Sequence, residues 1–301
     1  MKKIFCIFIL VFSSLKVLIA APVDYSEEVK EKKKTKKKGK KPSQLSPVVR
    51  RPETSLRGSW VFETSLETID VDSFSPQEKT SLYKLNVYYK PRPDFYFKVS
   101  QFYGASNDIN LNGAFSKKGN LEVRLVANWL RWSNGDYDTK LDIFGGVSIK
   151  ERNSNFASSR NDKIVGFETA RNFSNFIFSL GHELRLTSTP KDKAEMAIGD
   201  IRKYYAIFGW KVTSDINFAV EAVQHNIRPS NDEGLALKDK VVSGYLSPWL
   251  FLNLSARYDI IMGGVFRTNR IKNREELIKA RLWSFQGLYG NSIFAKINVN
   301  I

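Results

Sequence analysis

His182 and His225 are the only histidines in the 301-residue sequence and the natural candidates for a general base. A hydrolase also needs a nucleophile within reach of that base and a third group that orients it. Side chains alternate between the two faces of a strand, so His182 shares an apolar face with Leu180, while Ser179 falls on the opposite face. His225 shares its face with Glu221 and has no serine at a short same-face spacing. The sequence therefore predicts no catalytic residue and no enzyme.

Metal and cofactor sites are also not expected. Two isolated histidines without carboxylates at ligand spacing do not make a metal site. Cys6 is the only cysteine and lies in the N-terminal apolar segment, so the rest of the chain has no thiol chemistry. The Gly145-Gly146 and Gly263-Gly264 pairs lack the lysine and the strand-to-helix context of a phosphate-binding loop.

The first 21 residues predict a secretory signal peptide. Lys2 and Lys3 precede an apolar stretch that ends at the small residues Ala20 and Ala21. A membrane anchor is the other reading, but Lys16 cuts the apolar run below the roughly 20 residues that a spanning helix needs. We expect export to the periplasm, with cleavage near Ala20 or Ala21.

Residues 22–57 form a basic segment with too few apolar residues to fold, and we expect a disordered linker. Its position after an export signal and its lack of interleaved aromatics argue against nucleic-acid binding. Lipid phosphates, lipopolysaccharide and the cell wall are the polyanions that such a segment would meet, and a plain solvated spacer is an equal alternative. The expected polyanion-binding residues are Lys32, Lys33, Lys34, Lys36, Lys37, Lys38, Lys40 and Lys41.

Residues 58–301 alternate apolar and polar positions in blocks of about ten residues, separated by turn signals, which is typical of β-strands. The pattern is clearest at 121–132 and at 293–301. About 14 strands are expected if a weak one at 109–115 counts, and 12 is the alternative. This count includes separate strands at 240–246 and 250–262, divided by Ser247-Pro248, and a strand at 277–285.

Closing these strands into a barrel would bring one face to lipid and the other to a lumen. No later stretch approaches 18 uninterrupted apolar residues, and a closed barrel is the only spanning structure besides helices. A charge facing lipid near the midplane costs about 2–4 kcal/mol, so the polar face is assigned to the lumen, with a positive bias. The expected lumen-lining residues are Lys84, Lys98, Glu122, Arg124, Lys140, Asp142, Glu168, Glu183, Arg185, Lys211, Glu221, Arg257, Lys279, Arg281 and Lys296.

The export signal, the series of hairpins and the amphipathic last strand together resemble bacterial outer-membrane β-barrel proteins of the porin-like kind. The resemblance covers residues 58–301 and is architectural. It implies an antiparallel transmembrane barrel in the outer membrane of a Gram-negative bacterium, surrounded by outer-membrane lipid and lipopolysaccharide. Two features depart from it: Ile301 replaces the usual terminal aromatic, and the last connection, residues 287–291, is short where the family has a long extracellular loop.

The expected function is a passive pore, or a structural barrel closed by its own ion pairs, with a mildly cationic lumen. Two other classes stay open: an outer-membrane lipid-modifying enzyme that uses His182 or His225, and a soluble exported all-β binding protein with a polyanion-binding tail. The soluble reading is open because a β-sandwich has the same two-residue period.

Overall fold

The structure of the protein is a computed structural model, which describes residues 59–71, 79–92, 94–106, 117–134, 137–151, 154–232, 234–269, 271 and 274–301. The predicted signal peptide (1–21), the basic linker (22–57) with its eight lysines, and the weak strand at 109–115 lie outside these residues. They stay predictions.

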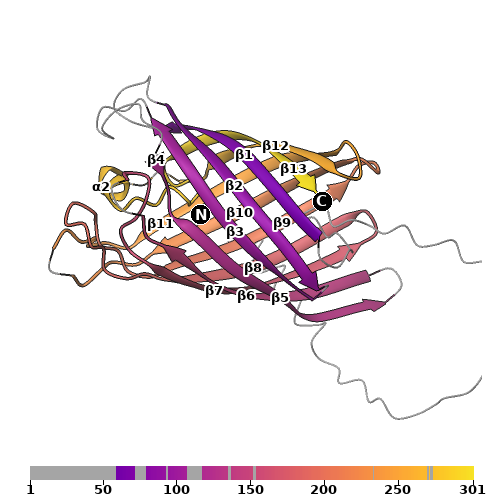
Figure 1. The fold of residues 1–301 in the computed structure, drawn as a ribbon, viewed down its shortest axis with the longest axis horizontal. Helices are drawn as coiled ribbons and strands as arrows, with labels where there is room; N and C mark the ends of the chain where they lie inside the picture. Colours follow the sequence, from indigo (N-terminus) through magenta and orange to yellow (C-terminus); the bar gives the residue numbers. More distant parts are fainter. Residues whose placement is uncertain are drawn as a thin grey trace, which may run out of the picture. The chain divides into compact units, whose positions relative to one another are not determined.

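Twelve long antiparallel strands close into a barrel, and β4 (Lys117–Lys118) is a two-residue addition that pairs with β3 (Figure 1). The long strands are β1 (Ser59–Val71), β2 (Lys79–Arg92), β3 (Phe95–Ser106), β5 (Leu121–Asn134), β6 (Tyr137–Ile149), β7 (Asp162–Phe173), β8 (Phe176–Leu186), β9 (Ile201–Lys211), β10 (Ile216–Ile227), β11 (Val241–Asn253), β12 (Tyr258–Arg267) and β13 (Gly290–Asn300). Pairing of β1 with β13, from Val61↔Asn300 to Val71↔Gly290, closes the barrel. The all-β transmembrane barrel is confirmed, with the smaller of the two expected strand counts.

Pro248 does not divide two strands, as the sequence had suggested. It lies inside β11 and pairs with Val220 of β10. On the other side, the pairing of β11 with β12 stops at Leu246↔Phe266 and resumes at Trp249↔Gly263. Proline has no N–H to donate, so the strand passes through it with a local gap in the ladder. The predicted break at Ser247-Pro248 was wrong, and the real turn comes later, at residues 254–257.

The segment at 277–285 is not a strand either. It begins with helix α2 (Arg274–Lys279) and continues in turns up to β13. Leu277, Leu282 and Trp283 are each no more than 2% exposed, so the segment is apolar because it packs inside the barrel mouth. Its apolar and polar residues alternate as they do in a strand, which led to the wrong prediction. This error explains the puzzling short last connection, because the real connection between β12 and β13 is the long segment 268–289.

The two ends of the barrel now follow the usual rule of short periplasmic turns and long extracellular loops. At the end that holds Ser59 and Asn300, the connections are as short as Ser174-Asn175 between β7 and β8. We call this the turn end. The opposite, loop end carries the long connections 150–161, 187–200, 228–240 and 268–289. In outer-membrane barrels that follow this rule, the turn end lies at the periplasm and the loop end at the cell exterior.

Alternation along each strand separates the lipid face from the lumen. Outward residues such as Phe62, Leu85 and Ile297 are large, apolar and exposed. Aromatic residues gather outward near the strand ends, where amphipathic rings favour the membrane interface; Trp60 stacks on Tyr89 at the turn end with ring centroids 4.4 Å apart. No helix in the described part of the chain is long and apolar enough to cross a membrane.

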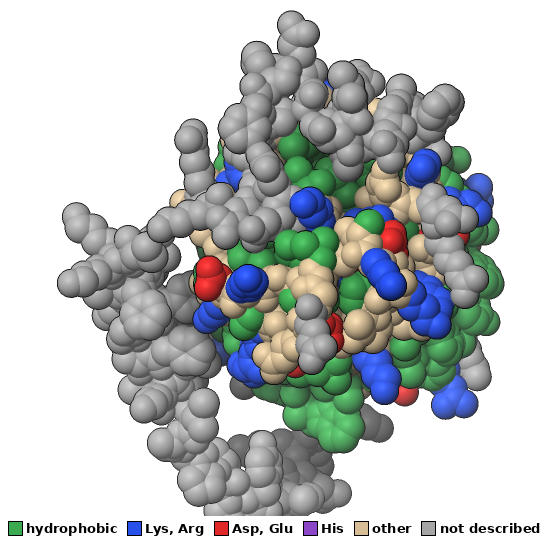
Figure 2. Space-filling view, turned by 90° about the vertical axis from the view of Figure 1, so that its left-hand side faces the viewer, with side chains coloured by type: hydrophobic (Ala, Val, Ile, Leu, Met, Phe, Trp, Pro, Cys, Tyr) green, Lys and Arg blue, Asp and Glu red, His purple; other side chains and the backbone are tan. Residues whose placement is uncertain are grey.

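The loop end is filled by a hydrophobic plug. We give this name to the segments 154–161, 187–200, 228–240 and 274–289 where they fold into the mouth. Trp283 lies at the centre of the plug, with ring centroids 5.2 Å from Phe156 and 4.3 Å from Tyr289. The same apolar cluster includes wall residues such as Val71 and Ile201. Figure 2, which faces this end, shows hydrophobic and polar groups across it, with Lys and Arg among them.

Backbone hydrogen bonds join the plug segments to one another. Met196 N donates to Lys279 O at 3.0 Å, and Ala197 N donates to Leu235 O at 2.8 Å. The hydroxyl of Tyr289 accepts from Leu282 N at 2.7 Å and donates to Leu277 O at 3.0 Å. The plug is therefore a folded unit with its own internal bonding.

Candidate functional site

Most of the predicted lumen residues lie on barrel strands at inward positions. Their exposure and register alternate with those of the outward apolar residues. The residues placed in this way are Lys84, Lys98, Glu122, Arg124, Lys140, Asp142, Glu168, Glu183, Arg185, Lys211, Glu221 and Lys296.

Arg257, Lys279 and Arg281 are not on the barrel wall, which corrects their predicted placement. Arg257 is exposed in the turn between β11 and β12, at the turn end. Lys279 ends helix α2 and is exposed. Arg281 belongs to the plug and has a φ of 52°. All three errors come from the two wrong strand assignments, since a strand's parity has no meaning in a turn or a helix.

The lumen also contains acidic residues that the sequence-based set did not include. Glu63, Glu67, Asp162 and Asp259 are inward on β1, β7 and β12. The alternation in the sequence already placed these residues on the polar face. Asp162 was left out because the predicted strand began one residue later, at Lys163. They bring the acidic groups of the lumen close to the basic ones in number, so the positive bias is local rather than general.

The part of the lumen toward the loop end holds an interlocked set of four ion-paired residues. Arg124 contacts Glu183 at 2.7 Å and also pairs with Glu122. Arg185 contacts Glu122 at 2.8 Å and Glu183 at 3.4 Å. Each arginine therefore bridges the same two carboxylates, which come from β5 and β8. Such alternation cancels charge and fixes the geometry of planar guanidinium groups.

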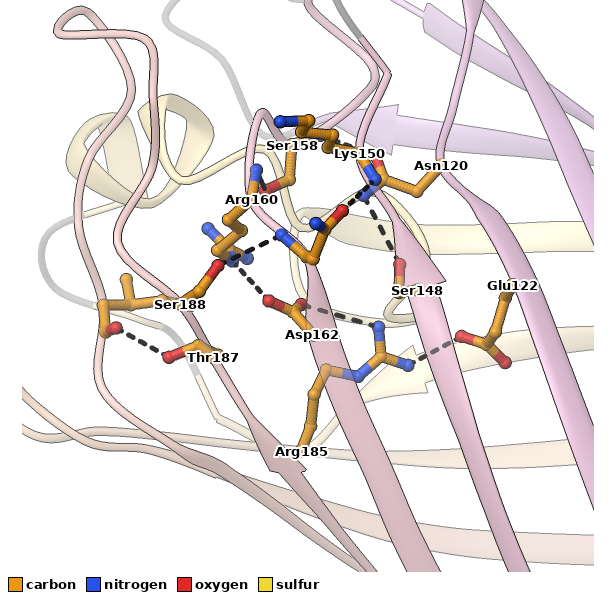
Figure 3. A network of polar contacts seen from close by, with 12 residues as sticks. Asn120, Glu122, Ser148, Lys150, Ser158, Arg160, Asp162, Arg185, Thr187 and Ser188 are labelled. Atoms are coloured by element: carbon orange, nitrogen blue, oxygen red, sulfur yellow. Dashed lines mark hydrogen bonds and ion pairs between the residues drawn. The ribbon is translucent and has the colours of Figure 1, made fainter.

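This set continues to the plug as a chain of alternating charges (Figure 3). Arg185 reaches Asp162 at 3.9 Å, Asp162 contacts Arg160 at 3.2 Å, and Arg160 contacts Glu195 at 3.0 Å. Arg160 and Glu195 are 1% and 2% exposed. We call the seven residues Arg124, Glu122, Glu183, Arg185, Asp162, Arg160 and Glu195 the ion-pair ladder.

Further contacts tie the ladder to the plug. Arg160 Nη1 donates to Ala280 O at 3.2 Å, and the Arg185 guanidinium lies 4.7 Å from the Phe285 ring centroid. Arg281 contacts Asp192 at 2.8 Å. A hydrogen bond from Ala194 N, together with Arg281, holds the pKa of Asp192 below its usual value. The plug is therefore attached to the wall by buried charges as well as by apolar packing.

The inward charged groups below the plug keep partial contact with water. The side chain of Lys203 is 25% exposed and that of its partner Glu221 is 20% exposed, whereas Glu195 in the plug is fully buried. A small cavity adjoins the ladder, lined among others by Asn120, Ser148 and Ser158. Among the described residues, the lumen is therefore polar and partly exposed below the plug, and buried apolar side chains of the plug fill its loop end.

The two histidines lie in different environments, and neither has the contacts of a catalytic base. His182 faces outward, with its ring 4.8 Å from Tyr204 and 6.1 Å from Phe167. His225 faces inward, 1% exposed, against Phe285 at 5.2 Å. Its cross-strand neighbour is Ser243, which a search at short spacing could not find. The buried Ser243 Oγ has no hydrogen-bond partner, so the histidine does not activate it here.

Metal binding has no support within the described residues, where no group of three His, Cys, Asp or Glu side chains is arranged to hold an ion.

Comparison with solved structures finds the same architecture. The outer membrane channel COG4313 from Pseudomonas putida F1 is similar with a TM-score of 0.59 and 11% identity, over 82% of this chain and 96% of that chain. The fold is that of a bacterial outer-membrane β-barrel. Together with the apolar outer surface, it places the protein in the outer membrane.

Two further barrels are more distant. The NanC porin has a TM-score of 0.49 at 8% identity, over 80% of this chain and 98% of its own. Outer membrane phospholipase A from Escherichia coli has a TM-score of 0.42 at 10% identity, over 80% and 92%. No family model and no curated protein matches the sequence.

Proposed function

We propose that this outer-membrane barrel is a narrow channel for small solutes, closed at its outer mouth by the plug. The observation that carries the proposal is the charged, partly water-accessible wall of the lumen below the plug. Buried ion pairs are not needed to stabilise an inert barrel, because replacing them by well-packed apolar groups is often neutral or stabilising. A polar wall is what a passage for hydrated solutes needs.

The resemblance to a solved outer membrane channel supports this proposal at the level of architecture. Twelve strands lie between the filled 8-stranded barrels and the open 16-stranded porins. A lumen of this size conducts only if its own side chains leave room. We therefore expect a small conductance that rises when the plug is released.

Planar-bilayer recording of refolded protein tests the proposal. The double variant Arg160→Ala, Glu195→Ala removes the ion pair that fastens the plug, and we expect its mean conductance to rise severalfold over the parent protein. Arg131→Ala is the matched control, because it removes an exposed ion pair with Asp138 at the turn end, far from the plug. We expect this control to conduct like the parent protein.

Ion preference gives a second measurement on the same membranes. Lysines near the middle of the lumen predict a modest anion preference, seen as a shift of reversal potential in a salt gradient, that fades at high salt through screening. Absence of conductance in every variant would favour the structural barrel. Cation selectivity would overturn the electrostatic part of the proposal.

The lipid-enzyme alternative has less support, because a hydrolase needs a nucleophile activated by its base. The ring of His182 packs against Phe167 and Tyr204. The hydroxyl of Ser243, beside His225, has no hydrogen-bond partner among the described residues. Lipid hydrolysis by the parent protein that is lost in His182→Ala or His225→Ala would revive this alternative.

A further inference from the structure

Three inward lysines cluster on the side of the lumen where the barrel closes. Lys84 on β2 and Lys296 on β13 both lie opposite Ser65 of β1, one on each side. Lys98 on β3 pairs with Tyr88, two positions further along the inward face of β2. We call Lys84, Lys98 and Lys296 the lysine triad. Their side chains are all partly exposed, which leaves the ammonium groups accessible to a ligand.

The carboxylates around the triad are engaged by other groups. Glu63 is a carboxylate on which all three lysines act electrostatically, but its oxygens are hydrogen-bonded to Asn86 and, at 3.4 Å, to Tyr88. Within the described residues none of the three lysines forms an ion pair within 4 Å. Glu122 of β5 lies across from Ser100 and also acts on Lys84 and Lys98, but its oxygens contact Arg124 and Arg185. In the described part of the chain, none of the three lysines therefore has a carboxylate of its own.

The other inward lysines in the middle of the lumen differ from the triad. Lys203 lies 3.9 Å from Glu221, and Lys140 lies 3.9 Å from Asp142. Each therefore has a carboxylate of its own. The triad lysines, on β13, β2 and β3, lack such a partner within 4 Å among the residues that the structure describes.

A buried hydroxyl group lies beside the triad. Ser100 is inward on β3, two residues from Lys98, and pairs with Asn86 across the strand. It is 5% exposed and its Oγ has no hydrogen-bond partner. An unsatisfied buried hydroxyl costs free energy, and an oxyanion held by the neighbouring lysines would accept a hydrogen bond from it.

We propose that the lysine triad and Ser100 bind a small divalent oxyanion, for which hydrogen phosphate is the model ligand. A divalent anion would give the three lysines a shared partner, and ammonium groups are common partners of phosphate. Lys98 and Ser100 lie directly across from Arg124 and Glu122 of the ladder, and the plug fills the loop end, so the ligand reaches the triad from the turn end. The site deepens the proposed channel function, on which its role in transport rests, but binding does not require conduction.

Isothermal titration of refolded protein in detergent with sodium phosphate, at pH 7.5 and low ionic strength, tests the site. We expect saturable binding of one phosphate by the parent protein. The triple variant Lys84→Gln, Lys98→Gln, Lys296→Gln should bind at least tenfold more weakly. Lys203→Gln is the matched control, an inward lysine already paired with Glu221, and it should bind like the parent. Heat-modifiable migration on gels checks that each variant folds.

Two further titrations define the ligand. A short dicarboxylate in place of phosphate distinguishes recognition of a phosphate from recognition of any divalent anion, and acetate measures the contribution of a single charge. No saturable binding of either divalent anion, or equal binding by the triple variant, would overturn the site. Phosphate binding without conductance would defeat the channel and leave the site standing, whereas conductance without binding would do the reverse.

Discussion

The ion-pair ladder and the lysine triad occupy the same lumen but arrange charge in opposite ways. In the ladder each arginine lies between carboxylates, and the chain of pairs continues into the plug. In the triad no lysine contacts a carboxylate of the described residues, and the two acidic groups that act on them, Glu63 and Glu122, are engaged by other partners. The first arrangement holds the structure together, and the second has charge to offer a ligand. Residue type alone does not separate these roles, because both regions consist of basic and acidic side chains on alternating positions.

Of the variants that test this comparison, removal of Arg160 should have the largest effect on the structure. Arg160→Ala leaves Glu195 buried without its cation, and loss of one partner of a buried pair costs about 3–5 kcal/mol. We expect the plug to open while the barrel stays folded. Hydrogen exchange measured by mass spectrometry should accelerate in residues 187–200 and 274–289. Unchanged exchange there would mean that the ladder does not fasten the plug.

Tyr289→Phe tests the plug without altering a pair of charges. The hydroxyl is buried and bonds two backbone groups of the plug, Leu282 N and Leu277 O, and burial raises the pKa of Tyr289. Loss of both bonds should destabilise the plug by about 1–3 kcal/mol. Exchange should accelerate at Leu282 and its neighbours, less than in Arg160→Ala. An effect as large as that of Arg160→Ala would argue that charge pairing is not the main fastening.

Lys98→Gln should change stability in the opposite direction. Relief of repulsion within the triad should stabilise the barrel by about 1 kcal/mol at low salt, seen as a higher urea midpoint for unfolding from detergent micelles. The gain should shrink at high salt. Arg124→Gln, in the ladder, is the contrasting variant and should destabilise. If Lys98→Gln also destabilises the barrel, Lys98 makes a stabilising interaction in the parent protein, and repulsion among the triad lysines is not the dominant effect.

Acidification should give the smallest effect. Because the pKa of Asp192 is lowered in the folded protein, its contribution to the plug is complete above the ordinary aspartate pKa and is lost as pH falls through the lowered value. The side chain of Asp192 is 40% exposed, so the loss should be slight. Hydrogen exchange at Ala194, corrected for intrinsic rates, should rise between pH 5 and pH 3. Asp192→Asn should remove that rise.

The sequence predicted the wall of this barrel well because the wall obeys a simple rule. A strand with lipid on one side must alternate, so the parity of Lys84, Arg124 or Glu183 could be read directly. The rule failed where residues did not face lipid. Residues 277–285 are apolar because they form the plug, and Pro248 was tolerated at a gap in the ladder.

The functional contacts were less predictable. Arg160 and Glu195 lie in segments that read as ordinary polar loops, and nothing in their local pattern shows that they meet 35 residues apart. The triad, by contrast, needed only the register. Once β13 is known to pair with β1, and β1 with β2, Lys296 and Lys84 must flank Ser65.

The closing seam between β1 and β13 also sets the order in which the molecule can be made. Ser292 donates to Glu67 across 225 residues of sequence, so the first strand must wait for the last before its second edge is paired. Until then the sheet has two free edges, which are sites for pairing with other chains, and contacts of this range make folding slow. The wall on which the triad lies is therefore completed last, and the triad becomes a single cluster only when the barrel closes.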